Sequence, residues 1–285
     1  MFCVDKLRFD PRNPDPEVLR RAVFARLRVG WGQVENADFD GQQLRKGFEA
    51  VLEFVEPTPP IPGGWQREFV NAVYNVVWEL VTEGVIRPGN ASGLAFPSLS
   101  VTDYGRRVIA SEKAHPQDIE RFLEGVRCGQ PIDATVEAYV IESLHSFRQN
   151  RLVASAILLG VAAERTFLII SDALLEALSD PKQHAEFKKR LDRQPMKPKL
   201  DWAHSKLMEL DTRRKQLPDY PESVPLMVTG IYDLIRHQRN DLGHPRDLPP
   251  RLERGRVESH LMLFSEYYRG AEELRAFLVG HKASL

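Results

Sequence analysis

The segment from Leu152 to Leu178 constrains the fold more than any other part of this chain. Its middle, residues 154–170, carries apolar side chains on nearly every side of a predicted helix. A helix that is apolar all round has to be surrounded by other elements. We therefore expect an all-α bundle with this helix at its centre. Helical periodicity predicts its companions at Asp133–Phe147, Leu200–Gln216, Glu222–Gly243 and Arg256–Leu278.

Length and composition predict a soluble protein of two domains. A chain of 285 residues is longer than one ordinary core requires. The break at Cys128–Pro131 divides it into domains at 1–128 and 129–285. Hydrophobic content of 42% and charged content of 28% are typical of soluble globular proteins. No apolar run approaches a membrane span and Met1–Lys6 lacks a signal-peptide pattern, so we expect a cytoplasmic location.

The first domain is predicted to combine helices with two short extended segments. A strong amphipathic pattern indicates a helix over Gln66–Glu83, which Gly84 ends. Two extended segments, Val85–Arg87 and Ser98–Val101, flank a turn-rich loop, and Thr102 then caps another helix. Weaker patterns predict two upstream helices and a rigid Pro-rich loop, at Pro16–Arg28, Gln42–Phe54 and Glu56–Gly64.

This order of helix, strand, loop, strand and helix resembles the winged-helix segment of many bacterial proteins. The strings Val77–Gly89 and Val101–Arg106 carry the resemblance, which implies a helical domain with a small β-hairpin wing. Carboxylates on the helix before the wing would repel a phosphate backbone, so we expect this domain to contact a protein partner rather than read DNA. The predicted exposed face of that helix comprises Arg67, Glu68, Asn71, Asn75, Glu79 and Glu83.

The end of the predicted helix Glu222–Gly243 holds the most reactive side chains, in the string Arg239-Asn240-Asp241-Leu242-Gly243-His244. A guanidinium binds phosphate through paired hydrogen bonds, and an imidazole exchanges a proton near neutral pH. At helical spacing Arg236, Asn240 and His244 share one outward edge, opposite an apolar stripe, with Arg239 beside them. The motif therefore indicates binding or cleavage of a phosphodiester without a metal. The apolar stripe comprises Val224, Met227, Val228, Ile231, Leu234, Ile235 and Leu242.

A second concentration of positive charge lies between Lys182 and Lys199, with seven basic residues against two acids. Such a run is either a solvated linker or helix face, or a surface that steers phosphates. On the second interpretation, Lys188, Lys189 and Arg190 of this segment are candidate RNA-binding residues. Arg236 and Arg246, on either side of the helix-end motif, are candidates as well.

An all-helical domain whose penultimate helix ends in Arg-Asn-x-x-x-His resembles the HEPN superfamily, in particular its abortive-infection and RNA-cleaving branches. The resemblance spans residues 133–280 and includes Ala162–Arg165, where relatives often carry a polar residue among apolar ones. The general spacing of Arg and His occurs three times, but only the first pair has Asn after Arg and is expected to end a helix. The three pairs are Arg239/His244, Arg254/His260 and Arg275/His281.

The resemblance implies an endoribonuclease of a defence or toxin system that needs no metal or other cofactor. It also implies a homodimer in which two motifs face each other and cut RNA. Arg239 would then hold the scissile phosphate, and His244 would be the acid or base for attack by the ribose 2′-hydroxyl. Asn240 would orient the histidine or the phosphate, and Glu164 would support the site.

Another interpretation of the same residues is structural. Arg239 would pair with Asp241 or Glu164, and His244 would cap a helix. The protein would then be a non-catalytic HEPN-like scaffold, or a regulatory module that binds a nucleotide or a protein. Asp233 and His237 lie at i and i+4, but without a third ligand we expect them on the surface.

Overall fold

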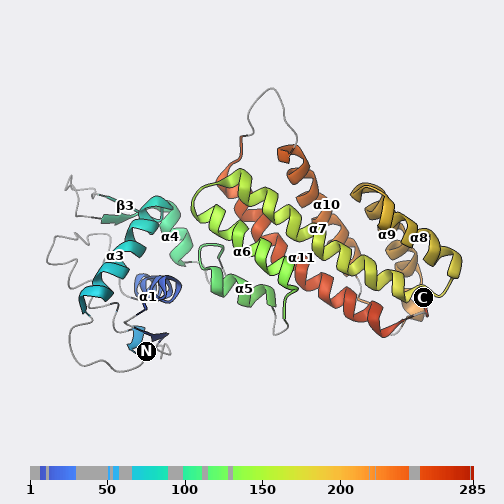
Figure 1. The fold of residues 1–285 in the computed structure, drawn as a ribbon, viewed down its shortest axis with the longest axis horizontal. Coiled ribbons are helices and arrows are strands. Elements are labelled where there is room, and N and C mark those ends of the chain that lie inside the picture. The colour runs from blue at the N-terminus through green and yellow to red at the C-terminus, as the bar shows by residue number, and fades with distance from the viewer. Residues whose placement is uncertain are drawn as a thin grey trace. The chain divides into compact units, whose positions relative to one another are not determined.

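The computed structural model of the chain is mainly helical, as predicted (Figure 1). Its two compact units are Met1–Phe122 and Leu123–Leu285. The boundary lies inside helix α5 (Ile119–Arg127), so the break predicted after residue 128 comes just beyond that helix. The structure describes residues 7–10, 13–29, 51, 54–57, 66–88, 99–110, 115–127, 131–217, 219–221, 223–243, 251–282 and 284–285.

The first unit packs two helices, α1 and α3, over a common apolar core and adds two small strand pairs. Strand β3 is antiparallel to β4, with Ile86 opposite Val101, where the two extended segments are predicted. Strand β1 is parallel to β2, with Leu7 opposite Val55, and the sequence did not predict this pair. The elements are β1 (Leu7–Phe9), α1 (Pro16–Val29), β2 (Val55–Pro57), α3 (Gln66–Thr82), β3 (Ile86–Pro88), β4 (Leu99–Val101) and α4 (Asp103–Ala110).

The start of the predicted Pro-rich loop Glu56–Gly64 is a strand, because Glu56 and Pro57 both belong to β2. A proline is tolerated there because a two-stranded sheet consists of edge strands. The predicted helix Gln42–Phe54, which precedes this loop, lies outside the described residues except for Val51 and Phe54.

A buried arginine from α1 changes the interpretation of the acidic face of α3. Arg20 is 1% exposed and forms an ion pair with Glu83, which is also buried. Its Nη1 atom lies 3.8 Å from Glu79, and its Nε atom donates to the carbonyl of Gln117 at 3.1 Å. Two of the three carboxylates therefore neutralise an internal cation, and the side chain of Glu68 lies outside the described residues. The prediction that these acids face outward is wrong for Glu83.

The second unit is an antiparallel arrangement of four long helices, α6, α7, α10 and α11, with the hairpin α8–α9 inserted (Figure 1). The apolar helix α7 contacts each of the other three, which confirms its central place. The elements after α5 are α6 (Ala134–Arg148), α7 (Leu152–Ala177), α8 (Pro181–Arg193), α9 (Met196–Thr212), the 3-10 helix η3 (Arg214–Gln216), α10 (Val224–Gly243) and α11 (Arg254–Gly280).

Contacts between rings and glycines fix the register of α10 on α7. Phe167 stacks on Tyr232 with ring centroids 4.7 Å apart, and Gly160 lies against Arg239. The two helices are therefore antiparallel, and the end of α10 reaches the first half of α7. By length and composition alone α7 could cross a membrane, contrary to the prediction that no run approaches a span. Half of its apolar window is buried in the bundle, as in the core helix of a soluble protein.

The basic segment between Lys182 and Lys199 is almost entirely helical, which agrees with a helix face and not with a linker. It forms α8 and the first turn of α9, joined by stacking of Phe187 on Trp202 at 3.9 Å. Pro195 is the N-cap of α9 and Pro198 lies in its first turn. Proline is tolerated at both positions because the first N–H groups of a helix have no intrahelical partner.

Candidate functional site

The face that α10 presents to the bundle differs from the predicted one. Tyr232, Arg236 and Gln238 are buried, whereas Leu226 and Leu234 are 59% and 43% exposed. The prediction that Arg236 points outward is therefore wrong, and Leu234 does not belong to the core stripe. The cause is that α10 meets α7 through aromatic and long polar side chains, which the pattern of aliphatic residues cannot reveal. Asn240 is half-buried at the edge of this face.

Arg239 lies against α7 at a position that only glycine leaves open. A Cβ atom at Gly160 would come within 2.5 Å of both Cβ and Cγ of Arg239. Gly160 therefore lets the arginine stem cross the helix closely, which fixes where the guanidinium lies. The residue was missed from the sequence, although a glycine inside an apolar helix is a recognisable sign of close approach.

The guanidinium of Arg239 is held by two partners and remains partly open to solvent. Its Nη2 atom lies 3.6 Å from a carboxylate oxygen of Glu164 on α7, and Nη1 donates to Oδ1 of Asn240 at 3.1 Å. The side chain of Arg239 is 35% exposed and that of Glu164 is 19% exposed. The predicted pairing of Arg239 with Glu164 is thus present. A guanidinium has five donors, so this arrangement leaves capacity for an anion.

Tyr232 lies beneath this site with its ring between Phe167 and Tyr267. Its hydroxyl group is buried, and no described group hydrogen-bonds to it. Burial, together with the negative charge of Glu164, raises the pKa of Tyr232 far above its usual range. The tyrosine therefore stays neutral, and its ring packs between α7 and α11. The spacing of the aliphatic residues did not indicate this packing role.

Arg236 belongs to a separate cluster one turn earlier on α10. Its Nη2 atom donates to Asp233 at 2.7 Å, and His237 Nε2 lies 3.4 Å from the same carboxylate. Burial alone would raise the pKa of Asp233, but Arg236, His237 and Lys197 lower it below its ordinary value. Arg236 is therefore buried and paired with the partly exposed Asp233, which argues against its predicted role in binding RNA. Among the described residues no group of three potential metal ligands occurs.

The remaining predicted site residues fall into two groups. Lys188 and Lys189 are exposed on α8, and Arg190 is half-buried and hydrogen-bonded to Glu186 at 2.7 Å. Within the described ranges no contact joins these three to Arg239, although Lys197 of the same basic segment acts electrostatically on Asp233. His244 and Arg246 lie outside the described residues.

The two other Arg/His pairs are engaged in packing. His260 is buried, and Arg254 lies 4.2 Å above the ring of Phe147 and donates to Asn150 at 3.2 Å. Arg275 donates to Glu272 at 2.8 Å, and His281 Nδ1 lies 2.9 Å from the carbonyl of Phe277. Arg254 begins α11 and His281 is its C-cap, so the expectation that only the first pair would be at a helix end is wrong.

A cavity of about 420 Å³ beside α6, α7 and α11 is lined by two ion pairs and by Asp172, whose pKa is raised by burial. Arg165 donates to Asp133 through two nitrogens, at 3.2 and 2.9 Å. These hydrogen bonds lower the pKa of Asp133, which also caps α6. Arg275 pairs with Glu272 in the same cavity. These two ion pairs therefore form part of the wall of the cavity and stabilise the structure around it.

The arrangement that remains is a partly exposed guanidinium, fixed by a glycine contact and flanked by a carboxylate and an amide. Such a group can bind a phosphate oxygen and stabilise negative charge on it. Compared with known proteins, the chain matches no family, no curated protein and no solved structure.

Proposed function

We propose that the protein is a metal-independent endoribonuclease of a defence or toxin system, built on a HEPN-like helical unit. The observation that carries the proposal is the position of Arg239. The stem of this side chain packs on Gly160, and the side chain as a whole remains 35% exposed. A pre-positioned cation contributes most where negative charge develops during a reaction. The sequence puts the only Arg-Asn-x-x-x-His string at this place.

In the proposed reaction Arg239 binds a non-bridging oxygen of the scissile phosphate. His244 removes the proton of the ribose 2′-hydroxyl, whose oxygen attacks the phosphorus. The bond to the 5′-oxygen of the next nucleotide breaks, and that oxygen takes a proton. The products are a 2′,3′-cyclic phosphate and a 5′-hydroxyl, so the chemistry requires RNA. Asn240 keeps the guanidinium in place through its hydrogen bond to Nη1.

Two further elements complete the proposal. A homodimer in the cytoplasm would bring two copies of the motif to one RNA strand. The first unit would act as a winged-helix-type module that recruits or senses. The order α3, β3, β4, α4 supports this interpretation.

Cleavage of total RNA in the presence of EDTA tests the proposal. Wild-type protein should cut RNA, whereas Arg239→Ala and His244→Ala should each lose about 100- to 1,000-fold in rate, as when a charge-stabilising group is removed. Arg275→Ala is the matched control, because Arg275 has the same general spacing to a histidine but pairs with Glu272. Equal loss in the control, or cleavage that requires added metal, would reject the assignment.

One observation favours the alternative, a non-catalytic HEPN-like scaffold or a module that binds a nucleotide or protein. The ion pair of Arg239 with Glu164 gives the arginine a structural role in joining α10 to α7. If this is its only role, purified wild-type protein will leave RNA intact under all conditions that keep it folded. Arg239→Ala will then change stability alone.

A further inference from the structure

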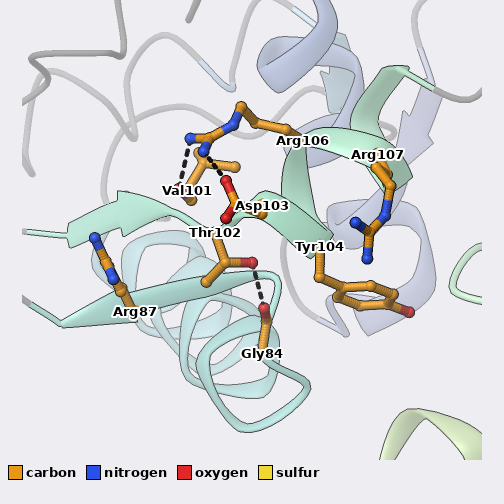
Figure 2. A pocket seen from close by; sticks show the side chains of 8 residues that line it. All are labelled: Gly84, Arg87, Val101, Thr102, Asp103, Tyr104, Arg106 and Arg107. Carbon is orange, nitrogen blue, oxygen red and sulfur yellow. Dashed lines mark hydrogen bonds and ion pairs between the residues drawn. The ribbon is translucent and has the colours of Figure 1, made fainter. Parts of the chain in front are cut away.

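A second basic site lies in the first unit, at the corner where the strand pair β3–β4 meets α4 (Figure 2). The corner encloses an open groove of about 520 Å³. Three arginines line it, one from β3 and two from α4, together with a tyrosine and one carboxylate. We call the surface formed by these residues, Arg87, Arg106, Arg107, Tyr104 and Asp103, the corner groove.

The backbone behind the corner groove is tightly fixed. Thr102 donates from its backbone N–H to the carbonyl of Val85 at 3.0 Å, and its hydroxyl group donates to the carbonyl of Gly84 at 2.6 Å. The same hydroxyl oxygen accepts the N–H of Gly105 at 2.8 Å and so caps α4. A Cβ atom at Gly105 would lie 1.9 Å from the carbonyl oxygen of Val85. Helix α4 is therefore locked onto the start of β3.

The positive charge of the corner groove exceeds its negative charge. Arg87 donates to the hydroxyl group of Ser100 at 3.0 Å, which is a neutral partner. Arg106 pairs with Asp103, and both side chains are exposed, so the pair is weak. Arg107 is exposed and forms no ion pair with any described residue. Figure 2 shows Arg87 and Arg107 on opposite sides of the corner, with Arg106 between them.

Tyr104 gives the corner groove an aromatic wall. Its hydroxyl oxygen accepts a hydrogen bond from Gln117 at 3.1 Å, and its ring meets His115 edge-on with centroids 6.4 Å apart. Spaced cations combined with a fixed aromatic ring match single-stranded nucleic acid, because the cations bind phosphates and the ring stacks on a base. The carboxylate of Glu83, directly after α3, does not repel a bound phosphate, because it is buried against Arg20.

We propose that the corner groove binds single-stranded nucleic acid, with phosphates on Arg87, Arg106 and Arg107 and a base on Tyr104. This site lies in the other unit from Arg239 and does not depend on RNA cleavage. The proposal differs from the expectation that the first unit contacts a protein partner rather than DNA.

The test is fluorescence anisotropy of the full chain with a labelled single-stranded oligodeoxynucleotide of about 12 nucleotides. The probe lacks the 2′-hydroxyl, so the proposed nuclease cannot cut it. Its phosphates can also bind Arg239, so the groove is reported by the difference in affinity between the wild type and the groove variants. The variant with Arg87, Arg106 and Arg107 all replaced by Ala should bind more weakly. Its plot of log affinity against log salt should be less steep by about 0.7 for each phosphate that the variant no longer binds.

Tyr104→Leu should weaken binding about 5- to 150-fold, the range for removal of one stacked base. Tyr104→Phe keeps the ring and should bind like the wild type, which separates stacking from misfolding. Arg8→Ala is the matched arginine control, because Arg8 is exposed in the same unit and does not line the groove.

Unchanged affinity and salt dependence in the folded triple variant would overturn the proposal. So would inorganic polyphosphate displacing the oligodeoxynucleotide at equal phosphate concentration while Tyr104→Leu binds normally. That result would mean a site for any polyanion rather than for nucleic acid.

Discussion

Two arginines in different units each contact a glutamate from another segment of their unit, but in very different surroundings. Arg20 is 1% exposed, pairs with Glu83, and gives two further hydrogen bonds to Gln117 at 3.1 and 2.9 Å. Arg239 is 35% exposed, and its nearest approach to Glu164 is 3.6 Å. An arginine and a glutamate therefore form a buried ion pair in the first unit and a partly solvent-exposed ion pair in the second.

The difference separates a structural arginine from one that is available for a ligand. The two charges of a buried ion pair have both lost their water, so removing one partner leaves the other charge uncompensated. A partly exposed pair contributes little to stability, because water competes for both charges. Arg20 should therefore matter for folding and Arg239 for function.

The largest effect is expected for Arg20→Ala, which removes the cation that pairs with the buried carboxylate of Glu83. The first unit should lose about 3–5 kcal/mol of unfolding free energy. Urea denaturation is followed by tryptophan fluorescence in a Trp202→Phe background. The signal then reports this unit alone, because the remaining tryptophans all precede residue 122; they are Trp31, Trp65 and Trp78. Arg21→Ala, which removes an exposed pair with Glu120, should cost less than about 1 kcal/mol. A loss for Arg20→Ala as small as for Arg21→Ala would contradict the comparison.

A smaller effect is expected for Gly160→Ala, which tests the contact that positions Arg239. The added methyl group meets the stem of the arginine, and overpacking of this kind costs about 1–3 kcal/mol. Hydrogen exchange of the α7 and α10 amides should become faster, and RNA cleavage should fall with it.

Gly230→Ala is the matched control for that experiment, because a Cβ at Gly230 meets nothing within 4 Å. It should stabilise α10 by about 0.5–1 kcal/mol through helix propensity alone. If both glycine variants are stabilising, Arg239 is not held by the close approach of the two helices.

The smallest effect is expected in the pH dependence of the unfolding free energy. It concerns His260, the buried histidine of the pair Arg254/His260. Burial lowers the pKa of His260, and the charge of Arg256 adds to the effect. Because the folded-state pKa lies below the unfolded value of about 6.5, protonation favours the unfolded chain. Unfolding free energy should fall as the pH drops below that value, and less so in His260→Asn. His145→Asn, at an exposed site, is the control for replacing a histidine by asparagine as such.

The sequence was sufficient for the helices and insufficient for the polar interior. Long apolar periodicity located α3, α6, α7, α10 and α11 to within a few residues at each end. Strands β1 and β2 were missed because no turn signal marks them as a pair, whereas the equally short β3 and β4 flank a turn-rich loop. Helix α8 was left open as a linker or a helix face, because its charges and the prolines after it outweighed its single buried aromatic, Phe187.

The candidate site could be located from the sequence but not built from it. The motif was singled out because its side chains suit phosphate chemistry at the end of a predicted helix, and Glu164 because the family resemblance includes Ala162–Arg165. The orientation of Arg236 was not, because an arginine that is 7% exposed depends on Asp233 for its burial. Gly160 and Tyr232 were missed because their roles depend on which helix lies opposite, and hydrophobic periodicity does not specify this.

The most direct test measures RNA cleavage and unfolding free energy together in Arg239→Ala. The comparison of the two arginines predicts a rate lower by about 100- to 1,000-fold with stability changed by about 1 kcal/mol or less. A loss of several kcal/mol, as for Arg20→Ala, with an unchanged rate in the folded fraction would show that Arg239 only joins α10 to α7.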